Sequence, residues 1–315
     1  MHKHELLAVT NQRLRRQATF ASLAVASLLI AAKLVAWLMT DSVAMLTSLF
    51  DSTFDLAASL VTAYGVASAL RPPDREHRYG HGKAEPLAVL AQAIFIIGSS
   101  VVLVYEAASR LYHPHPIHND GVAYSVMGVA IVLTIALIVF QHYVVSQTRS
   151  VAIGADKLHY VGDLAVNLSV IGAFLLHRLT GIEWFDPVFA VAIASGLLVS
   201  AFHILKHALV SLMDAELPPQ QRAQIRATVL SVQGVRGVHD LRTRSDGDRI
   251  FIVLHVEMDG QMTLLEAHSL SEKIMDSLMA QFPHADVTIH QDPVGIIEDR
   301  LDTQIEARQR EAQSP

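Results

Sequence analysis

The sequence predicts a membrane domain of six transmembrane helices followed by a small α+β domain, and two observations carry this prediction. The chain has 315 residues, of which 51% are hydrophobic and only 17% are charged, with a mean hydropathy of +0.35. Six apolar segments of roughly membrane-spanning length, about 20 residues, lie between residues 18 and 210. The composition then turns polar. We therefore expect an N-terminal tail (1–17), a membrane domain (18–210), an α+β domain (211–298) and a flexible tail (299–315).

Composition also excludes several classes of protein. The chain contains no cysteine, so disulfides and thiolate metal sites are excluded, and histidine and carboxylate remain as the strong ligands. A net charge of -6 gives no reason to expect nucleic-acid binding. No segment indicates an obligate protein partner of another kind. The first apolar run exceeds the length of a signal peptide, so we expect it to remain as a span.

Basic residues predict how the six spans are oriented. Lysine and arginine gather in the N-terminal tail and after the second, fourth and sixth spans, while the other loops hold almost none. By the positive-inside rule, a multi-pass protein with this pattern has both termini in the cytoplasm and the lipid bilayer as its surroundings. The expected spans are Ala18 to Met39, Val43 to Leu70, Pro86 to Leu111, Val122 to Tyr143, His159 to His177 and Val188 to Leu205.

Two of these spans carry ionisable side chains with helical spacing. Asp51 and Asp55 lie four residues apart in the second span, and His159 and Asp163 do the same in the fifth, so each pair shares a helical face. A charge in a membrane helix costs roughly 2.5–3.5 kcal/mol and usually serves ions or substrates. Three carboxylates and one imidazole suit a tetrahedral divalent metal. The alternative is four separate polar residues that face an aqueous pore or hydrogen-bond within the bundle. We expect Lys33, in the first span, to snorkel or to pair with a neighbouring acid.

Two loops hold further groups of candidate ligands. Asp74, His77 and His81 follow the second span, where Gly80 and Gly82 let the backbone turn. This group could bind metal or form an ordinary solvated turn, and the sequence favours neither. A weaker group after the third span consists of His113, His115 and His118.

The soluble segment reads as an α+β domain. Alternating apolar residues predict a strand at Arg249 to Met258, and Thr263 to Glu266 has the capping-box pattern that opens a helix. The other expected elements are a helix at Pro218 to Val232, strands at Gly237 to Arg244 and Asp286 to Gln291, a turn at Ser245 to Asp248, and a helix that ends near Phe282. This domain also carries five residues that could build one or two zinc sites, although any single histidine could be an ordinary surface residue: His239, His255, His268, His290 and Asp292.

Three stretches carry a resemblance to a known family. Tyr79 to Glu85, His239 to Arg244 and Ile289 to Pro293, together with the two paired motifs in the spans, resemble the cation diffusion facilitator family. The resemblance implies a metallochaperone-like fold for the C-terminal domain, a homodimer, and the bacterial inner membrane. It also implies efflux of Zn²⁺ and Cd²⁺, with Fe²⁺ as a further substrate, in exchange for H⁺ as the coupling ion. The protein is then a secondary active transporter and not an enzyme.

The same resemblance implies a role for each group of residues. Asp51, Asp55, His159 and Asp163 correspond to the transport site; Asp74, His77 and His81 to a loop site; and His239, His255, His268, His290 and Asp292 to a binuclear site where Zn²⁺ is a structural or regulatory ligand. Lys83 and Asp214 correspond to a charge pair that ties the dimer together. Two other classes remain open. One is a membrane-embedded metal sensor without transport, and the other is an intramembrane metalloenzyme, for which the chain offers no His-Glu-x-x-His motif.

Overall fold

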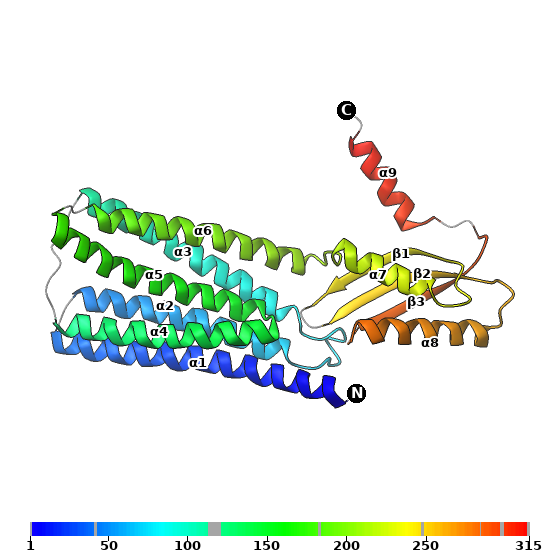
Figure 1. Cartoon of the computed structure of the whole chain (residues 1–315), viewed down its shortest axis with the longest axis horizontal. Coiled ribbons are helices and arrows are strands. Elements are labelled where there is room, and N and C mark those ends of the chain that lie inside the picture. Colours follow the sequence, from blue (N-terminus) through cyan, green and yellow to red (C-terminus); the bar gives the residue numbers. More distant parts are fainter. Residues whose placement is uncertain are drawn as a thin grey trace. The chain divides into compact units, whose positions relative to one another are not determined.

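The computed structural model describes residues 2–40, 43–112, 121–181, 184–246, 249–283, 285–296 and 299–313. The chain forms two compact units, Met1–Leu212 and Met213–Pro315, each with its own packed elements (Figure 1). His113, His115 and His118 lie outside the described residues, as does part of the turn expected at Ser245 to Asp248.

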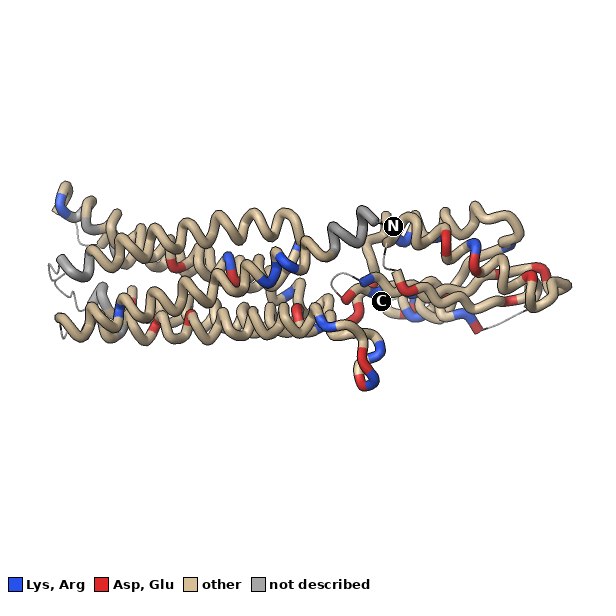
Figure 2. Tube along the Cα trace, turned by 90° about the horizontal axis from the view of Figure 1, so that it is seen from below, with Lys and Arg blue, Asp and Glu red and all other residues tan. Residues whose placement is uncertain are grey.

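The first unit consists of six long helices in its described part. They are α1 (His2–Thr40), α2 (Val43–Ala69), α3 (Ala84–Tyr112), α4 (Gly121–Thr148), α5 (Val151–Thr180) and α6 (Phe185–Leu212). Five of them are long and apolar enough to cross a membrane. The remaining helix, α2, has 27 residues and is therefore also long enough to span a bilayer. Charged positions are sparse along the helices (Figure 2).

Two boundaries in this unit differ from those expected. The tail at residues 1–17 is mostly helical, because α1 starts at His2. The polar stretch before the fifth span is also helical: α5 begins at Val151, eight residues ahead of His159. Only a short turn separates α4 from α5, where Arg149 has φ 53°. The polar side chains of Thr148, Ser150 and Asp156 in this stretch are buried among the helices, so they do not mark a loop exposed to solvent.

Helix α2 packs against α1, α3 and α5. Its approach to α3 depends on a residue without a side chain. A Cβ atom added at Gly65 would lie 2.3 Å from Cβ of Ala88 and 3.0 Å from the carbonyl oxygen of Ala84. The absence of a Cβ at this position therefore sets the spacing of α2 and α3.

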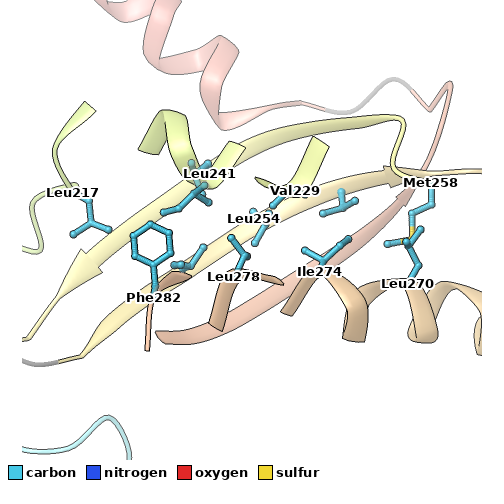
Figure 3. Close-up of a cluster of buried hydrophobic side chains, with 12 residues drawn as sticks. Leu217, Val229, Leu241, Leu254, Met258, Leu270, Ile274, Leu278 and Phe282 are labelled. Atoms are coloured by element: carbon cyan, nitrogen blue, oxygen red, sulfur yellow. The ribbon is translucent and has the colours of Figure 1, made fainter. Parts of the chain in front are cut away.

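The second unit is an α+β domain, as the sequence predicted. Its elements are α7 (Pro219–Leu230), β1 (Gly237–Ser245), β2 (Ile250–Met258), α8 (Leu264–Gln281), β3 (Ala285–Pro293) and α9 (Leu301–Gln313). The sheet has the order β1-β2-β3, with β1 antiparallel and β3 parallel to β2. Helices α7 and α8 pack together on one face and bury side chains such as Ile252, Leu254 and Ile274 (Figure 3). The capping box of α8 is present, with Thr263 and Glu266 bonded to each other's backbone N–H.

The tail expected to fray forms a helix instead. Residues Leu301–Gln313 make α9, whose first turn is held by Asp240 of β1. The Asp240 carboxylate accepts hydrogen bonds from the N–H groups of Leu301 and Asp302, both at 2.9 Å. In return, Asp302 accepts the N–H of Asp240 at 3.0 Å. This mutual capping satisfies N–H groups that a helix N-terminus otherwise leaves free.

We predict that Asp240→Asn releases α9. Burial raises the pKa of the Asp240 carboxyl, but the hydrogen bonds from the N–H groups of Asp302 and Leu301 lower it by more. The pKa of Asp240 therefore lies below its usual value. The ionised acceptor therefore contributes stability above the ordinary aspartate pKa of about 3.9, and the contribution is lost as the pH falls through the lower folded value. At pH 7 the variant should be cleaved faster by trypsin after Arg308 and Arg310. Asp299→Asn is the control, and equal cleavage rates in the two variants would contradict the anchor.

Candidate metal centres

The first cluster joins α2 to α5 inside the helical unit. Nε2 of His159 lies 3.0 Å from Oδ1 of Asp55 and 3.7 Å from Oδ2 of Asp163. One ligand atom from each of the three residues falls within 4.8 Å of the others. Ligands at the 2.0–2.2 Å bond length of a tetrahedral zinc ion are roughly 3.3 Å apart. The three side chains could therefore hold such an ion after small shifts.

Asp51 lies outside this group in the structure. It is exposed on α2, one turn from Asp55, and its role as a fourth ligand stays a prediction. A small pocket borders the cluster on the side of α1 and α4. Asp55 and Asp163 line it together with Lys33, Ser52, Tyr160, Asn167 and other residues.

A second carboxylate in α5, Asp156, was missed by the sequence reasoning. It is fully buried and accepts hydrogen bonds from four side chains on four other helices. Ser22 and Gln141 donate to Oδ2 at 2.7 and 2.8 Å, and Gln92 and Ser59 donate to Oδ1 at 3.2 and 3.4 Å. These five residues form the Asp156 network. In the sequence, Asp156 lies three residues before His159, inside the stretch from Ser146 to Lys157 that we expected to be a loop.

Another buried acid, Glu85, links the ends of α3, α4 and α5 to the interior of α1. Glu85, at the start of α3, accepts hydrogen bonds from Ser150 Oγ at 2.5 Å and from the N–H of Ala152 at 3.2 Å. Arg15 of α1 lies 3.4 Å from the other Glu85 oxygen and donates to the Thr148 carbonyl at 3.0 Å. The sequence reasoning assigned no role to these residues, because nothing in the sequence shows that they meet.

The loop group gathers around one carboxylate. Asp74 lies 3.3 Å from Nδ1 of His77 through one oxygen and 3.3 Å from Nε2 of His81 through the other. The N–H groups of His77 and Glu76 also donate to Asp74, and these bonds, with that from His77 first, lower the pKa of its carboxyl. Gly80 has φ 92°, a conformation that favours glycine and lets the loop fold back. The three residues form a candidate site that is largely exposed to solvent.

The second unit brings four of its five candidate ligands together on the open face of the sheet. His239 pairs with His255 across β1 and β2, and His255 pairs with His290 across β2 and β3. Oδ2 of Asp292 lies 3.3 Å from His239 and 2.8 Å from His255, and Oδ1 lies 3.1 Å from His290. A carboxylate whose two oxygens face different histidines can bridge two ions. The ring of His239 is buried between two carboxylates, with Nε2 3.3 Å from Oδ2 of Asp292 and Nδ1 3.2 Å from Oε1 of Glu257, and neither contact has hydrogen-bond geometry.

The fifth candidate, His268, lies apart from this group. It is exposed on α8, and α8 covers the opposite face of the sheet.

The predicted charge pair of Lys83 and Asp214 also stays a prediction. Lys83 donates to the carbonyl of Leu212 at 3.4 Å, and Asp214 lies 3.3 Å from Arg244.

These features define a multi-pass membrane protein with clusters suited to metal ions. The chain belongs to the cation efflux family: the family's transmembrane domain matches residues 19–213 and its cytoplasmic domain matches residues 217–294. The resemblance inferred from the motifs is thereby confirmed.

Relatives named cation-efflux pump FieF match almost the whole chain. FieF of Serratia proteamaculans is 43% identical over 285 residues, which are 90% of this chain and 95% of that protein. FieF of Klebsiella pneumoniae is 40% identical over 290 residues, again 90% and 95%. Among solved structures, the metal-bound C-terminal domain of the CzcD transporter from Thermotoga maritima is 30% identical, covers 26% of this chain and 100% of its own, and has a TM-score of 0.24. A Zn form of the transporter CzrB is 33% identical, covers 27% and 97%, and has a TM-score of 0.25.

We predict that Asp156→Asn destabilises the helical unit. Asparagine would turn an NH₂ donor toward side chains that themselves donate, so one or two buried hydrogen bonds would be lost at about 1–3 kcal/mol each. The thermal unfolding midpoint in detergent, followed by the fluorescence of Trp37 and Trp184, should fall by several degrees. Thr53→Ala serves as the control, because this exposed α2 hydroxyl donates to the Leu49 carbonyl of its own helix. An unchanged midpoint in Asp156→Asn would show that the network contributes little.

Proposed function

We propose that the protein exports Zn²⁺ and Cd²⁺, with Fe²⁺ as a further substrate, from the cytoplasm of a bacterial cell in exchange for protons. The observation that carries the proposal is the Asp55, His159 and Asp163 cluster, which joins two helices of membrane-spanning length. The relatives named cation-efflux pump support it. In this proposal the helical unit lies in the inner membrane, and both termini are cytoplasmic.

Competition for the same atoms would couple metal to protons. A carboxylate or imidazole binds a metal ion only after it has lost its proton, so protons and the substrate ion exclude each other. The 3.0 Å contact between His159 and Asp55 provides a place for a proton once the ion has left. Protons that enter from outside would therefore release the metal, and the departure of those protons to the cytoplasm would restore the ligands.

The donor types favour zinc-like ions over harder ones. Imidazole suits Zn²⁺ and Fe²⁺, whereas Mg²⁺, Ca²⁺ and Mn²⁺ prefer carboxylate, carbonyl and water oxygens. A site with one buried imidazole between two carboxylates therefore supports Zn²⁺ as the substrate. We extend the proposal to Asp51 as a fourth ligand that approaches when the ion is bound.

We further propose that metal binding in the second unit stabilises a homodimer. The cluster of His239, His255, His290 and Asp292 lies on the open face of the sheet, where a second copy could cover it. His268 cannot join the cluster of its own chain through the sheet, so it would have to come from a partner copy. Lys83 and Asp214 are proposed to add a charge pair to this dimer, and Asp74, His77 and His81 to bind metal at the cytoplasmic loop.

We expect zinc flux in sealed proteoliposomes to follow an imposed pH gradient and to be lost in Asp163→Ala. The variant removes one ligand of the cluster, so zinc flux should fall at least 100-fold. Asn167→Ala, four residues along the same helix, is the matched control because asparagine also lines the pocket but is not in the cluster. Folded wild-type protein that shows no flux would instead favour the membrane-embedded sensor.

We expect Asp292→Ala to abolish metal-dependent dimerisation while leaving the helical unit intact. Asp292 contacts all three histidines of the cluster, so its loss removes the bridging ligand. Analytical ultracentrifugation of the full chain with and without Zn²⁺ gives the dimer fraction. Asp286→Ala, an exposed acid on the same strand, is the control. Equal zinc responses in the two variants would refute this role.

A further inference from the structure

Lys33 is a positively charged side chain at the edge of the proposed transport site. It comes from α1, and it lines the same pocket as Asp55 and Asp163. Its Nζ donates to Ser52 Oγ at 2.6 Å and to the Ser48 carbonyl at 3.1 Å, both on α2. The ammonium group is therefore held beside the cluster and does not extend toward the end of its helix. We expected Lys33 to snorkel or to pair with a neighbouring acid, and the structure places its Nζ on two neutral oxygens of α2 beside the acids of the cluster.

The charges that attract Lys33 are those of the site itself. Asp55, Asp163 and Asp51 are the carboxylates that act on it, and none of them belongs to α1. The oxygen atoms that now hold the ammonium group are a hydroxyl and a backbone carbonyl, which carry no formal charge. Lys33 is thus anchored by neutral atoms while its charge acts on the carboxylates nearby.

Charge balance gives this position a consequence for the substrate ion. Three carboxylates carry three negative charges when ionised, and a bound divalent ion offsets two of them. The ammonium group of Lys33 offsets the third, and a neutral site costs less in an apolar bundle than a charged one. A fixed positive charge beside the cluster also repels a metal ion, because Coulomb interactions are strong where water is scarce.

We propose that Lys33 is a tethered counter-cation of the transport site, which weakens metal binding enough to permit release. The inference rests on the proposed function, because it takes the Asp55, His159 and Asp163 cluster as the transport site. Lysine suits this role because it presents a compact charge on a flexible four-carbon stem. It acts as a positioning charge and contributes no ligand atom, since it has no acceptor.

The test compares metal affinity with transport rate in Lys33 variants of the full chain. Loop and soluble-domain binding is first removed by alanine at His77, His81, His239 and His255. Zn²⁺ affinity is then measured in nanodiscs by competition with a chelating dye, and KM and kcat are measured in proteoliposomes. Lys33→Met should bind Zn²⁺ at least ten-fold more tightly and lower both KM and kcat by a similar factor. Lys33→Gln repeats the test with a side chain that can still donate to Ser52.

A control variant separates the charge from the shape of the side chain. Lys33→Arg keeps the charge, so its affinity and transport rate should stay within three-fold of the parent. A general packing defect would lower kcat without tightening metal binding, and that result would overturn the inference. The inference would also be overturned if Lys33→Met and Lys33→Gln bound Zn²⁺ with unchanged or weaker affinity while Asp163→Ala abolished Zn²⁺ binding. If Asp163→Ala still binds Zn²⁺ normally, the proposed transport site fails, and the role of Lys33 fails with it.

Discussion

The arrangement of the helical unit depends on how it satisfies a carboxylate buried among five helices. An ionised group in an apolar interior is tolerated only when its hydrogen-bonding capacity is met. Asp156 of α5 receives donors from α1, α2, α3 and α4, and no two of these donors come from the same helix. One side chain therefore sets the positions of four neighbours around α5. His159 lies one turn further along α5, and Tyr160 hydrogen-bonds to Ser59 of the same network at 2.9 Å, so the network also positions the cluster.

The contrast between Asp156 and the cluster shows how the same residue type takes two roles. Asp156 is surrounded by neutral donors that are themselves fully buried, so its acceptor positions are filled without a cation. Asp55 and Asp163 face an imidazole and border a pocket, where a proton or a metal ion can balance them beside the ammonium group of Lys33. A carboxylate with all its acceptor positions filled by fixed donors holds structure, whereas one facing a titratable group can exchange ligands. Helix α5 therefore contributes to a fixed hydrogen-bond network through Asp156 and to an exchangeable cluster through His159 and Asp163.

Much of this architecture could be predicted from periodicity. The six helices and the order of the soluble elements follow from apolar runs, alternation and a capping box, and the paired motifs indicated which side chains share a face. Three features could not be read this way. The polar stretch from Ser146 to Lys157 suggested a loop, because the sequence does not show that the partners of Ser150 and Asp156 lie on other helices. The tail was expected to fray because its anchor, Asp240, lies some 60 residues earlier in the chain. The contacts of His268 depend on which face of the sheet α8 covers.

The bulge in β1 explains why strand alternation alone would place His239 on the wrong face of the sheet. In an unbroken strand, His239, Leu241 and Thr243 would share one face, because side chains alternate with a period of two. The register instead shifts between His239 and Arg242, so His239 faces the open side with His255 while Leu241 and Thr243 are buried on the core side. This shift requires Asp240 to adopt φ 49°, a strained conformation for a residue other than glycine. The hydrogen bonds between Asp240 and the first turn of α9 offset that strain. The same residue thus places a metal-ligand side chain on the open face and fixes the C-terminal helix, and neither function is visible in the local sequence pattern.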